Sequence, residues 1–323
     1  MRGKTAPSVC VLVLNYNNYA DTLQCLRSLR ETTYPNFRVF VVDNGSVGPD
    51  VECINAEFGD SVSIVRLAQN VGFARGFNAG IRLALDASHE FVLVLNNDTK
   101  VHPQFLDALV REAMSAKNVG IAGPKILYYD QPGVIWHAGG AFDPKTGISR
   151  SRGLNEHDRG QYDYPAFVQG VSGCCMLFTR RFLQSAGLFD EQFFFGYEEH
   201  DINMRAWQAG FSVLFVPSAV IWHKVSRTIR SVVSSGYWSS YMEALGYLRF
   251  LRKHFGLAGT LRIVATRTLL DRYSQLMVST TRYPFVLRPY LDALLTMATR
   301  SRYVPFYART HRSSNPEQGL ELD

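Results

Sequence analysis

The feature that most constrains this chain is a short apolar run, Phe91–Leu95, which ends abruptly in Asn96-Asn97-Asp98. Such a run is typical of a strand buried on both faces of a sheet. In open α/β sheets, ligands bind at the carboxyl ends of the strands. One carboxylate flanked by amides at that edge suits a hard divalent cation that carries a diphosphate, because such cations prefer oxygen ligands. Taken alone, these residues are more typical of an Asx-turn, so the neighbouring motifs must decide.

Strands and helices are predicted to alternate through the first hundred residues. Apolar runs predict strands at residues 9–14, 37–42, 62–67 and 91–95, with helical patterns between them. This alternation is typical of a parallel, doubly wound α/β sheet. Three of the strands end in Asn or Asp, at residues 15, 43 and 96, so we expect polar side chains to converge on one edge of the sheet.

Two nucleotide-binding classes are disfavoured by the residues after the first strand. A dinucleotide-binding domain requires its glycine fingerprint there. Asn15-Tyr16-Asn17-Asn18 occupies that position and contains no glycine. A nucleotidyltransferase would also need a Gly-rich phosphate loop at this point.

Residues 101–225 are predicted to extend the same sheet, with a strand at 119–126 broken by Gly123-Pro124 and further strands at 211–216 and 219–222. Within 167–178, Gly170 and Gly173 predict a turn or a close approach of the backbone to another group. Residues 130–165 are rich in Gly, Pro, Asp and Arg, and we expect a long surface excursion that acts as a lid.

Composition indicates a globular chain. Of 323 residues, 46% are hydrophobic and 19% charged, which argues against wholesale disorder. The five cysteines show no zinc-like spacing, and no secretory segment precedes the first strand, so we expect reduced thiols and a cytoplasmic location. No apolar run approaches the ~18 residues of a membrane span.

The C-terminal region is strongly basic. Residues 224–312 hold 15 Lys and Arg against three Asp and Glu, within a chain of net charge +6. Apolar residues at helical spacing from Tyr241 to Phe255 predict a helical extension. It is either a cap on the main domain or a surface for an anionic partner, for which a membrane is favoured because no nucleic-acid recognition motif accompanies the charge. Residues 313–323 are expected to be disordered.

Two further groups carry candidate chemistry. Glu198, Glu199 and Asp201 cluster at a predicted helix start behind an aromatic run. They are either helix N-terminal charges or a general base whose pKa is raised by apolar rings and neighbouring carboxylates. His223 ends a predicted strand, and with Asp98 it would form a sensible Mn²⁺ or Mg²⁺ shell.

These motifs resemble those of a known family. The residues concerned are Val13–Asn17, Asp43–Ser46, Asn70–Gly80, Leu95–Asp98, Tyr197–Asp201 and Trp222-His223. Their order over residues 8–255 is similar to that of family-2 inverting glycosyltransferases of the GT-A fold, and most similar to the bacterial rhamnosyltransferase-type enzymes that build surface polysaccharides.

The resemblance implies a GT-A type doubly wound mixed sheet in a catalytic domain, residues 1–225. Its Rossmann-like half, 1–100, would bind the nucleotide sugar, and 101–225 would be the acceptor half. Residues 226–312 would be the basic helical extension.

The resemblance also assigns roles. Asp98 and His223 would bind the metal, and Asp98 is the single carboxylate where the family has an Asp-x-Asp motif. Asp43 would accept the imide N–H of uracil or thymine. Glu199 stands where the family carries its basic Asp, with Glu198 and Asp201 as alternatives. Contacts to the donor nucleotide are expected from Asn15, Asn17, Asp43, Asn70, Gly72, Phe73, Gly76, Asn78, Asn96 and Asn97.

The expected function is inverting, metal-dependent transfer of a sugar from a UDP- or dTDP-sugar to a saccharide or lipid-linked acceptor. Rhamnose is the first candidate for the sugar. The expected site of action is the cytoplasm, at the inner face of the cytoplasmic membrane. The alternative is a catalytically inactive relative that serves as a binding or scaffolding subunit.

Overall fold

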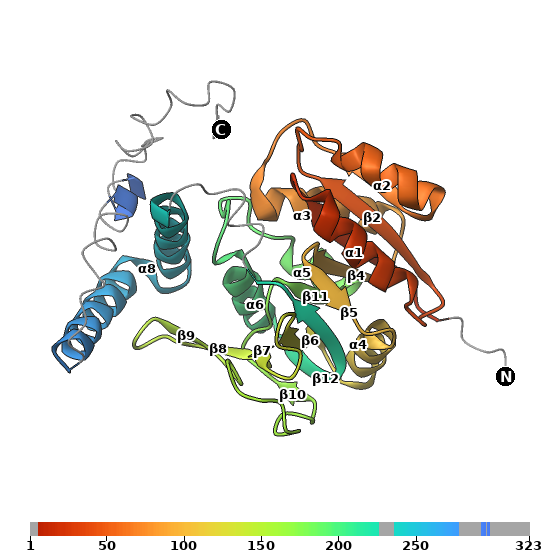
Figure 1. The fold of residues 1–323 in the computed structure, drawn as a ribbon. Helices are drawn as coiled ribbons and strands as arrows, with labels where there is room; N and C mark the ends of the chain where they lie inside the picture. The colour runs from red at the N-terminus through yellow and green to blue at the C-terminus, as the bar shows by residue number, and fades with distance from the viewer. Residues whose placement is uncertain (1–5, 226–235, 278–291, 295, 298–323) are drawn as a thin grey trace. The chain divides into compact units, whose positions relative to one another are not determined.

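The computed structural model describes residues 6–225, 236–277, 292–294 and 296–297. The chain divides into two compact units, residues 1–232 and 233–323, and each is described by itself. The first unit contains a large mixed sheet with helices on both faces (Figure 1).

The predicted alternation of strands and helices is confirmed in the first hundred residues. The elements are β1 (Val9–Asn15), α1 (Tyr19–Arg30), β2 (Phe37–Asp43), α2 (Asp50–Phe58), the 3-10 turn η1 (Gly59–Ser61), β3 (Ser63–Arg66), α3 (Gly72–Asp86) and β4 (Phe91–Asn96). Strands β4, β1, β2 and β3 lie side by side in that order and are all parallel. Their carboxyl ends therefore share one edge.

The second half adds antiparallel strands and makes the sheet mixed. Its elements are β5 (Thr99–Val101), α4 (Phe105–Ser115), β6 (Val119–Tyr128), β7 (Ile135–His137), β8 (Gly140–Asp143), β9 (Ile148–Ser151), β10 (Ala166–Phe167), β11 (Cys175–Thr179), α5 (Arg180–Ala186), α6 (Glu198–Gln208) and β12 (Ser212–His223). The sheet order is β10-β12-β6-β11-β4-β1-β2-β3, with β11 antiparallel to both β4 and β6. The predicted α/β mixed sheet is thus confirmed.

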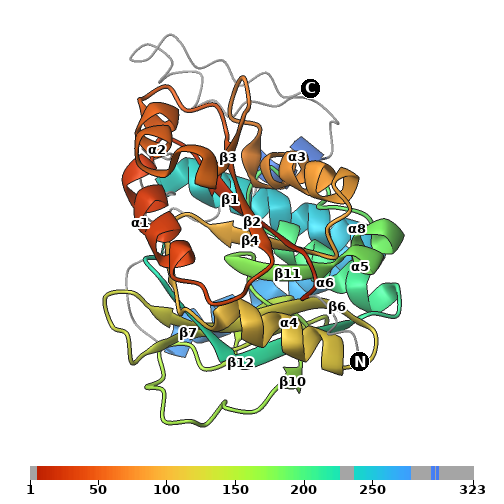
Figure 2. The same ribbon diagram turned by 90° about the vertical axis from the view of Figure 1, so that its right-hand side faces the viewer.

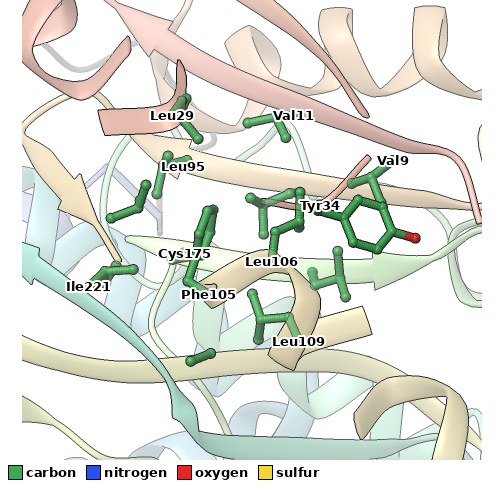
Figure 3. Close-up of a cluster of buried hydrophobic side chains, with 14 of the residues drawn as sticks. Val9, Val11, Leu29, Tyr34, Leu95, Phe105, Leu106, Leu109, Cys175 and Ile221 are labelled. Atoms are coloured by element: carbon green, nitrogen blue, oxygen red, sulfur yellow. The ribbon is translucent and has the colours of Figure 1, made fainter. Parts of the chain in front are cut away.

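The alternation of side chains along β1 places it in two cores. Val9, Val11 and Val13 pack with residues of α1, α2 and α4 on one face, as Figure 3 shows for part of this cluster. Cys10 and Leu12 pack with residues of α3, α5 and α6 on the other. Figure 2 shows α1 and α3 on opposite sides of β1 and β2. Burial on both faces explains why β1 and β4 are continuous apolar runs.

The break expected at Gly123-Pro124 is wrong, since β6 continues through both residues. The turn or close approach expected at Gly170 and Gly173 is found in the loop between β10 and β11. Within that loop, the backbone N–H of Val171 donates to Asn203 Oδ1 (3.3 Å), and Asn203 Nδ2 donates to Val171 O (2.9 Å). Because Asn203 satisfies the backbone groups that a sheet ladder would use, the segment leaves the sheet.

The strands expected at 211–216 and 219–222 form one strand, β12. Its pairing with β6 shifts register between Val216 and Val220. Pro217 lies within the shift, and proline is found at bulges because it has no N–H for the ladder.

The excursion over 130–165 contains β7, β8 and β9 and is fastened to the sheet. Lys125 of β6 is buried, and its Nζ lies 2.9 Å from Asp158 Oδ2 and 2.5 Å from Asp163 Oδ1. A buried ammonium paired with two carboxylates ties this segment to the sheet at both aspartates.

In the second unit, α8 (Gly236–Met277) is broken at Gly256, where φ is 67°. The helical pattern expected from Tyr241 to Phe255 lies before this break. Glycine adopts the left-handed conformation at low cost. Within the described part of the chain, no helix is long and apolar enough to cross a membrane. The predicted tail, residues 313–323, lies outside the described residues, as does most of the basic region after residue 277.

Candidate active site

The polar strand ends converge on the carboxyl edge of the sheet as predicted. Asn15, at the end of β1, is in register with Asp43 at the end of β2. On the other side of β1, Leu14 is in register with Asn96 of β4. Parallel pairing therefore brings three sequence motifs to one edge.

Asn15 organises the loop after β2. Its Nδ2 lies within hydrogen-bond distance of Asp43 Oδ1 (2.9 Å), Ser46 Oγ (3.1 Å) and Asp50 Oδ1 (3.0 Å). Asn15 and Asp43 are fully buried, and Ser46 Oγ also donates to Asp43 Oδ1 (2.5 Å). One amide thus fixes the orientation of the carboxylate expected to recognise the nucleobase.

Thr22 of α1 links two of these motifs and was not among the residues predicted from the sequence. Its hydroxyl donates to Asn15 Oδ1 (2.7 Å) and accepts from Asn97 Nδ2 (2.9 Å). Because Thr22 is fully buried, this hydroxyl links the Asn97 turn to the Asp43 loop through the interior. The sequence contained one indication of this role: Thr22 is at helical spacing with Leu26 and Leu29, so its hydroxyl had to lie on the buried face of α1.

Asn17 joins the loops after β1 and β2. Its backbone N–H donates to Ser46 Oγ (2.9 Å), and its Oδ1 accepts from the Val47 N–H (2.9 Å). Its φ of 48° is a conformation that asparagine tolerates better than most residues. Asn17 remains exposed at the edge.

The loop at Asn70–Phe73 is connected to the segment before α6. Asn70 Oδ1 accepts from the Gly72 N–H (2.9 Å) and from Asn44 Nδ2 (3.0 Å). Gly72 has φ +86°, and a Cβ there would lie 2.6 Å from the carbonyl oxygen of Phe194. The Phe73 N–H donates to that oxygen (2.9 Å). Only glycine allows this approach, which brings the predicted nucleotide loop against the aromatic run.

Gly76 and Asn78 are used for packing within the fold. A Cβ on Gly76 would lie 2.7 Å from Leu14 Cδ1, so this glycine lets α3 approach β1. Asn78 is buried, and its Nδ2 donates to Phe189 O (2.9 Å) and to Glu191 Oε1 (3.0 Å). Both residues therefore stabilise the packing of α3, and their expected contacts with the nucleotide stay a prediction.

Asp98 and His223 lie side by side. The distance from Asp98 Oδ1 to His223 Nε2 is 3.1 Å, and both side chains are buried. The edge of the imidazole contacts Trp136, with 4.7 Å between ring centroids. β5, which follows Asp98 directly, pairs with the end of β12 and brings the two residues together.

This pair fits a divalent cation whose shell is completed from outside the protein. Asp98 Oδ1 and His223 Nδ1 are buried without a hydrogen-bond partner among the described residues. Buried polar atoms without partners are rare and require an explanation such as an ion. Among the described residues, no group of three or more His, Cys, Asp or Glu could hold a metal. Other ligands would therefore come from substrate oxygens and water.

Glu199 is the accessible member of the acid cluster. Its side chain is 31% exposed, and its Oε2 accepts from the Gly173 N–H and from Ser172 Oγ (3.5 Å). A Cβ on Gly173 would lie 2.8 Å from that oxygen, so the glycine makes room for the carboxylate.

Glu198 and Asp201 are buried in different surroundings. Burial, reinforced by the charge of Glu199, raises the pKa of Glu198 from its ordinary value of 4.5 to about 8. Asp201 Oδ2 lies 2.8 Å from Arg205 Nε, and that guanidinium also donates to the carbonyls of Ala186 and Leu188. Asp201 thereby anchors α6 to the end of α5.

Cys174 connects the acid cluster with the metal-site candidates. Its carbonyl accepts from the Asn96 N–H (2.9 Å), directly before the Asp98 turn, while the preceding residue contacts Glu199. Burial raises the pKa of the Cys174 thiol well above its usual range, and the charges of Asp98 and Glu199 act in the same direction. Asp98, His223 and Glu199 therefore surround one segment of the sheet edge.

The excursion borders the acid helix. His200 Nε2 lies 2.8 Å from Ser149 Oγ of β9, and His137 Nδ1 lies 2.8 Å from Ser151 Oγ. Burial lowers the pKa of His137 to about 3, so its imidazole is neutral near pH 7. The sequence did not predict these contacts, because only the fold brings β9 to α6.

Comparison with known proteins identifies the family. The sequence model of the family "Glycosyl transferase family 2" matches residues 10–186. The chain belongs to this family. The enzyme is therefore a glycosyltransferase.

Three curated relatives illustrate the similarity of this glycosyltransferase. It is 28% identical to the O-antigen biosynthesis protein RfbC of Myxococcus xanthus, over 73% of this chain but 19% of that protein. It is 28% identical to the N-acetylglucosaminyl-diphospho-decaprenol L-rhamnosyltransferase of Mycobacterium tuberculosis, covering 69% of this chain and 78% of the relative. It is 24% identical to the dTDP-rhamnosyl transferase RfbF of Shigella flexneri, covering 68% and 69%.

Two solved structures share the GT-A fold. A mannosyltransferase from Pyrobaculum calidifontis, in complex with GDP-Man and Mn²⁺, has a TM-score of 0.56 at 16% identity, covering 95% of this chain and 84% of that one. GalNAc-T7 with UDP, GalNAc and Mn²⁺ has a TM-score of 0.55 at 17% identity, covering 87% and 59%. At these identities the likeness supports the fold alone.

Proposed function

We propose that this family-2 enzyme is an inverting, metal-dependent glycosyltransferase that moves a sugar from a dTDP- or UDP-sugar to a hydroxyl of a saccharide or lipid-linked acceptor. The observation that carries the proposal is the buried Asp98–His223 pair, on the same sheet edge as the accessible Glu199. A metal-ligand pair on one side and a carboxylate base on the other match the needs of one displacement at an anomeric carbon.

Glu199 is the proposed base. Its carboxylate takes the proton of the acceptor hydroxyl as that oxygen forms a bond to the anomeric carbon. The bond from the anomeric carbon to the diphosphate oxygen breaks in the same step, and the nucleoside diphosphate leaves with the electron pair. Attack from the opposite face inverts the configuration. The hydrogen bonds from Gly173 N–H and Ser172 Oγ hold the carboxylate in place.

Asp98 and His223 are the proposed metal ligands. A bound Mn²⁺ or Mg²⁺ would neutralise negative charge on the leaving diphosphate. The Asp98 carboxylate supplies a hard oxygen ligand, and the His223 nitrogen favours Mn²⁺ over Mg²⁺.

The nucleoside end of the donor is proposed to bind at the Asp43 loop. Asn15 and Ser46 both donate to Asp43 Oδ1. Asp43 Oδ2 accepts a longer hydrogen bond from the Ser46 N–H (3.3 Å) and lies 3.9 Å from Arg66 Nε. This leaves acceptor capacity on Oδ2 for the imide N–H of uracil or thymine. Exposed Asn17 and the Asn70–Phe73 loop are the proposed neighbours of the nucleotide.

Rhamnose is the proposed sugar, because two relatives are named as rhamnosyltransferases and one as using a dTDP-sugar. The test is a thermal-shift and donor-hydrolysis screen of dTDP- and UDP-sugars with Mn²⁺ or Mg²⁺, followed by transfer assays. We expect dTDP-rhamnose with Mn²⁺ to give the largest response. If no nucleotide sugar stabilises the protein or is turned over, the proposed activity is wrong.

The basic extension is proposed to hold the enzyme against the inner face of the cytoplasmic membrane. In α8, residues 244–269 contain five Lys and Arg and no Asp or Glu. Leu257, Leu261 and Leu269 in the same stretch are each more than half exposed. Exposed leucines beside cations suit an interface with anionic lipid, where a lipid-linked acceptor would be presented.

A further inference from the structure

A buried lysine at the end of β12 has no role in the mechanism described so far. The Lys224 side chain is 4% exposed, and its Nζ donates to Asp21 Oδ1 and to Gln24 Oε1, both on α1. Its ammonium also lies 5.2 Å from the ring centroid of Tyr129. Burying an ammonium is costly unless it is paired and hydrogen-bonded, and here α1 supplies both kinds of partner.

The backbone of Lys224 is also hydrogen-bonded to a residue of the proposed metal site. It follows His223 in the chain, and its backbone N–H donates to the carbonyl of Asp98 (3.0 Å). The His223 carbonyl accepts from the Tyr129 N–H (2.9 Å), and the Tyr129 hydroxyl accepts from Gln24 Nε2 (2.5 Å). Both proposed metal ligands are therefore connected to α1 through Lys224 and Tyr129.

The same helix holds the Asp98 turn at other points. Thr22 accepts from Asn97, and the Cys25 thiol lies 3.5 Å from Thr99 Oγ1. The face of α1 from Asp21 to Cys25 thus contacts residues on both sides of Asp98 and the residue after His223. Neither ligand is anchored by its own side chain among the described residues, apart from their mutual contact and the Trp136 ring.

We propose that Lys224 is a positioning residue for the metal site: its ammonium, held by Asp21 and Gln24, fixes the end of β12 against α1 and keeps His223 beside Asp98. The proposal rests on the proposed metal role of those two residues. Groups that orient metal ligands without touching the metal typically change metal affinity by about 10- to 100-fold when mutated.

The chain offers a matched control. Lys125 is another buried lysine with a side chain 4% exposed, and it too pairs with aspartates, Asp158 and Asp163. Lys125→Met breaks a buried ion pair of the same kind in the excursion. A merely structural role for Lys224 would make Lys224→Met behave like Lys125→Met.

The experiment is calorimetric titration of the full chain with dTDP or UDP in the presence and absence of Mn²⁺, alongside thermal melts. We expect Lys224→Met and Asp21→Asn to weaken Mn²⁺-dependent nucleotide binding by about 10- to 100-fold. Lys224→Arg keeps the positive charge and should retain part of the Mn²⁺-dependent nucleotide affinity. Lys125→Met should lower the melting temperature and leave nucleotide binding unchanged. If Lys224→Met does not fold, the nucleotide affinity of Asp21→Asn tests the proposal, because this substitution is nearly isosteric.

Two outcomes would overturn the proposal, and they can be told apart. If Lys224→Met or Asp21→Asn folds and binds Mn²⁺ and nucleotide as the unaltered protein does, the positioning role is wrong and the proposed function stands. If the unaltered protein shows no Mn²⁺-dependent nucleotide binding, the proposed metal site fails, and the role of Lys224 fails with it.

Discussion

The carboxylate of Asp98 lies 3.1 Å from Nε2 of His223, in a buried position between the ends of β4 and β12. The two residues are 125 positions apart in the chain (223 − 98), and pairing of β5 with β12 makes them neighbours. Because neither Asp98 Oδ1 nor His223 Nδ1 has a hydrogen-bond partner among the described residues, the pair is prepared to receive a ligand from outside.

Asp98→Ala is expected to abolish the metal dependence of donor binding. Calorimetry should show the Mn²⁺-dependent affinity for dTDP or UDP falling by more than about tenfold, since losing a ligand costs at least as much as losing its support. Asp86→Ala, which removes an exposed carboxylate at the end of α3, is the control. Unchanged metal-dependent affinity in Asp98→Ala would remove this residue from the metal site.

Glu199→Gln is expected to lower the transfer rate by about 10²- to 10⁴-fold, the usual contribution of a positioned base. Nucleotide-sugar binding should persist, because the amide keeps the size and the contact with Gly173. Glu199→Asp, a shorter side chain that retains the carboxylate, should keep part of the activity. Normal turnover by Glu199→Gln would refute the base assignment.

Glu198 is expected to make folding stability depend on pH. Its pKa in the folded protein, about 8, lies above the ordinary value of 4.5, so the folded state holds this proton more tightly than the unfolded state. The free energy of unfolding should therefore fall as pH rises from about 4.5 to about 8. Glu198→Gln mimics the neutral form and should be more stable above pH 8 by on the order of a few kcal/mol.

Chemical denaturation of both proteins at pH 4 and pH 9 checks this. The two should have similar stability at the lower pH and diverge at the higher one. A constant difference across the range would show that Glu198 does not retain its proton on folding.

Thr22→Val is expected to lower the free energy of unfolding by about 1–3 kcal/mol for each buried partner left unsatisfied. The side-chain partners are Asn15 Oδ1 at 2.7 Å and Asn97 Nδ2 at 2.9 Å, and the hydroxyl also lies 3.1 Å from the Asn18 carbonyl oxygen. Valine is nearly isosteric with threonine, so the change isolates the hydroxyl. Thr22→Ser keeps the hydroxyl and should retain most of these hydrogen bonds. Equal denaturation midpoints for Thr22→Val and the unaltered protein would contradict the linking role.

The full chain is expected to float with vesicles that contain anionic lipid at low salt, and to be released at high salt, because each Lys or Arg near such a surface contributes about 1 kcal/mol. Replacing Arg262 and Arg267 by Glu should abolish flotation. The same charge change at exposed Lys117 and Lys145, in the first unit, should not. Failure of the unaltered protein to float would remove the membrane proposal.

Much of the architecture was predictable because a strand that is buried on both faces requires a continuous run of apolar residues. β1 and β4 were recognisable for that reason, and so was the convergence of Asn15, Asp43 and Asn96 on one edge. The sequence could not show which groups approach Gly170 and Gly173, because Asn203 and Glu199 reach them only in the folded chain.

The sequence by itself determined the family, the strand-and-helix order, and the residue types available for chemistry, because these depend on local pattern. Only the tertiary structure decided which of those residues are buried, which are accessible and which partners each one contacts. It buried Glu198, paired Asp201 with Arg205, left Glu199 accessible, and turned Gly76 and Asn78 into packing residues. It also revealed Thr22 and Lys224, since a hydroxyl or an ammonium acquires such a role only when folding removes water and supplies partners distant in sequence.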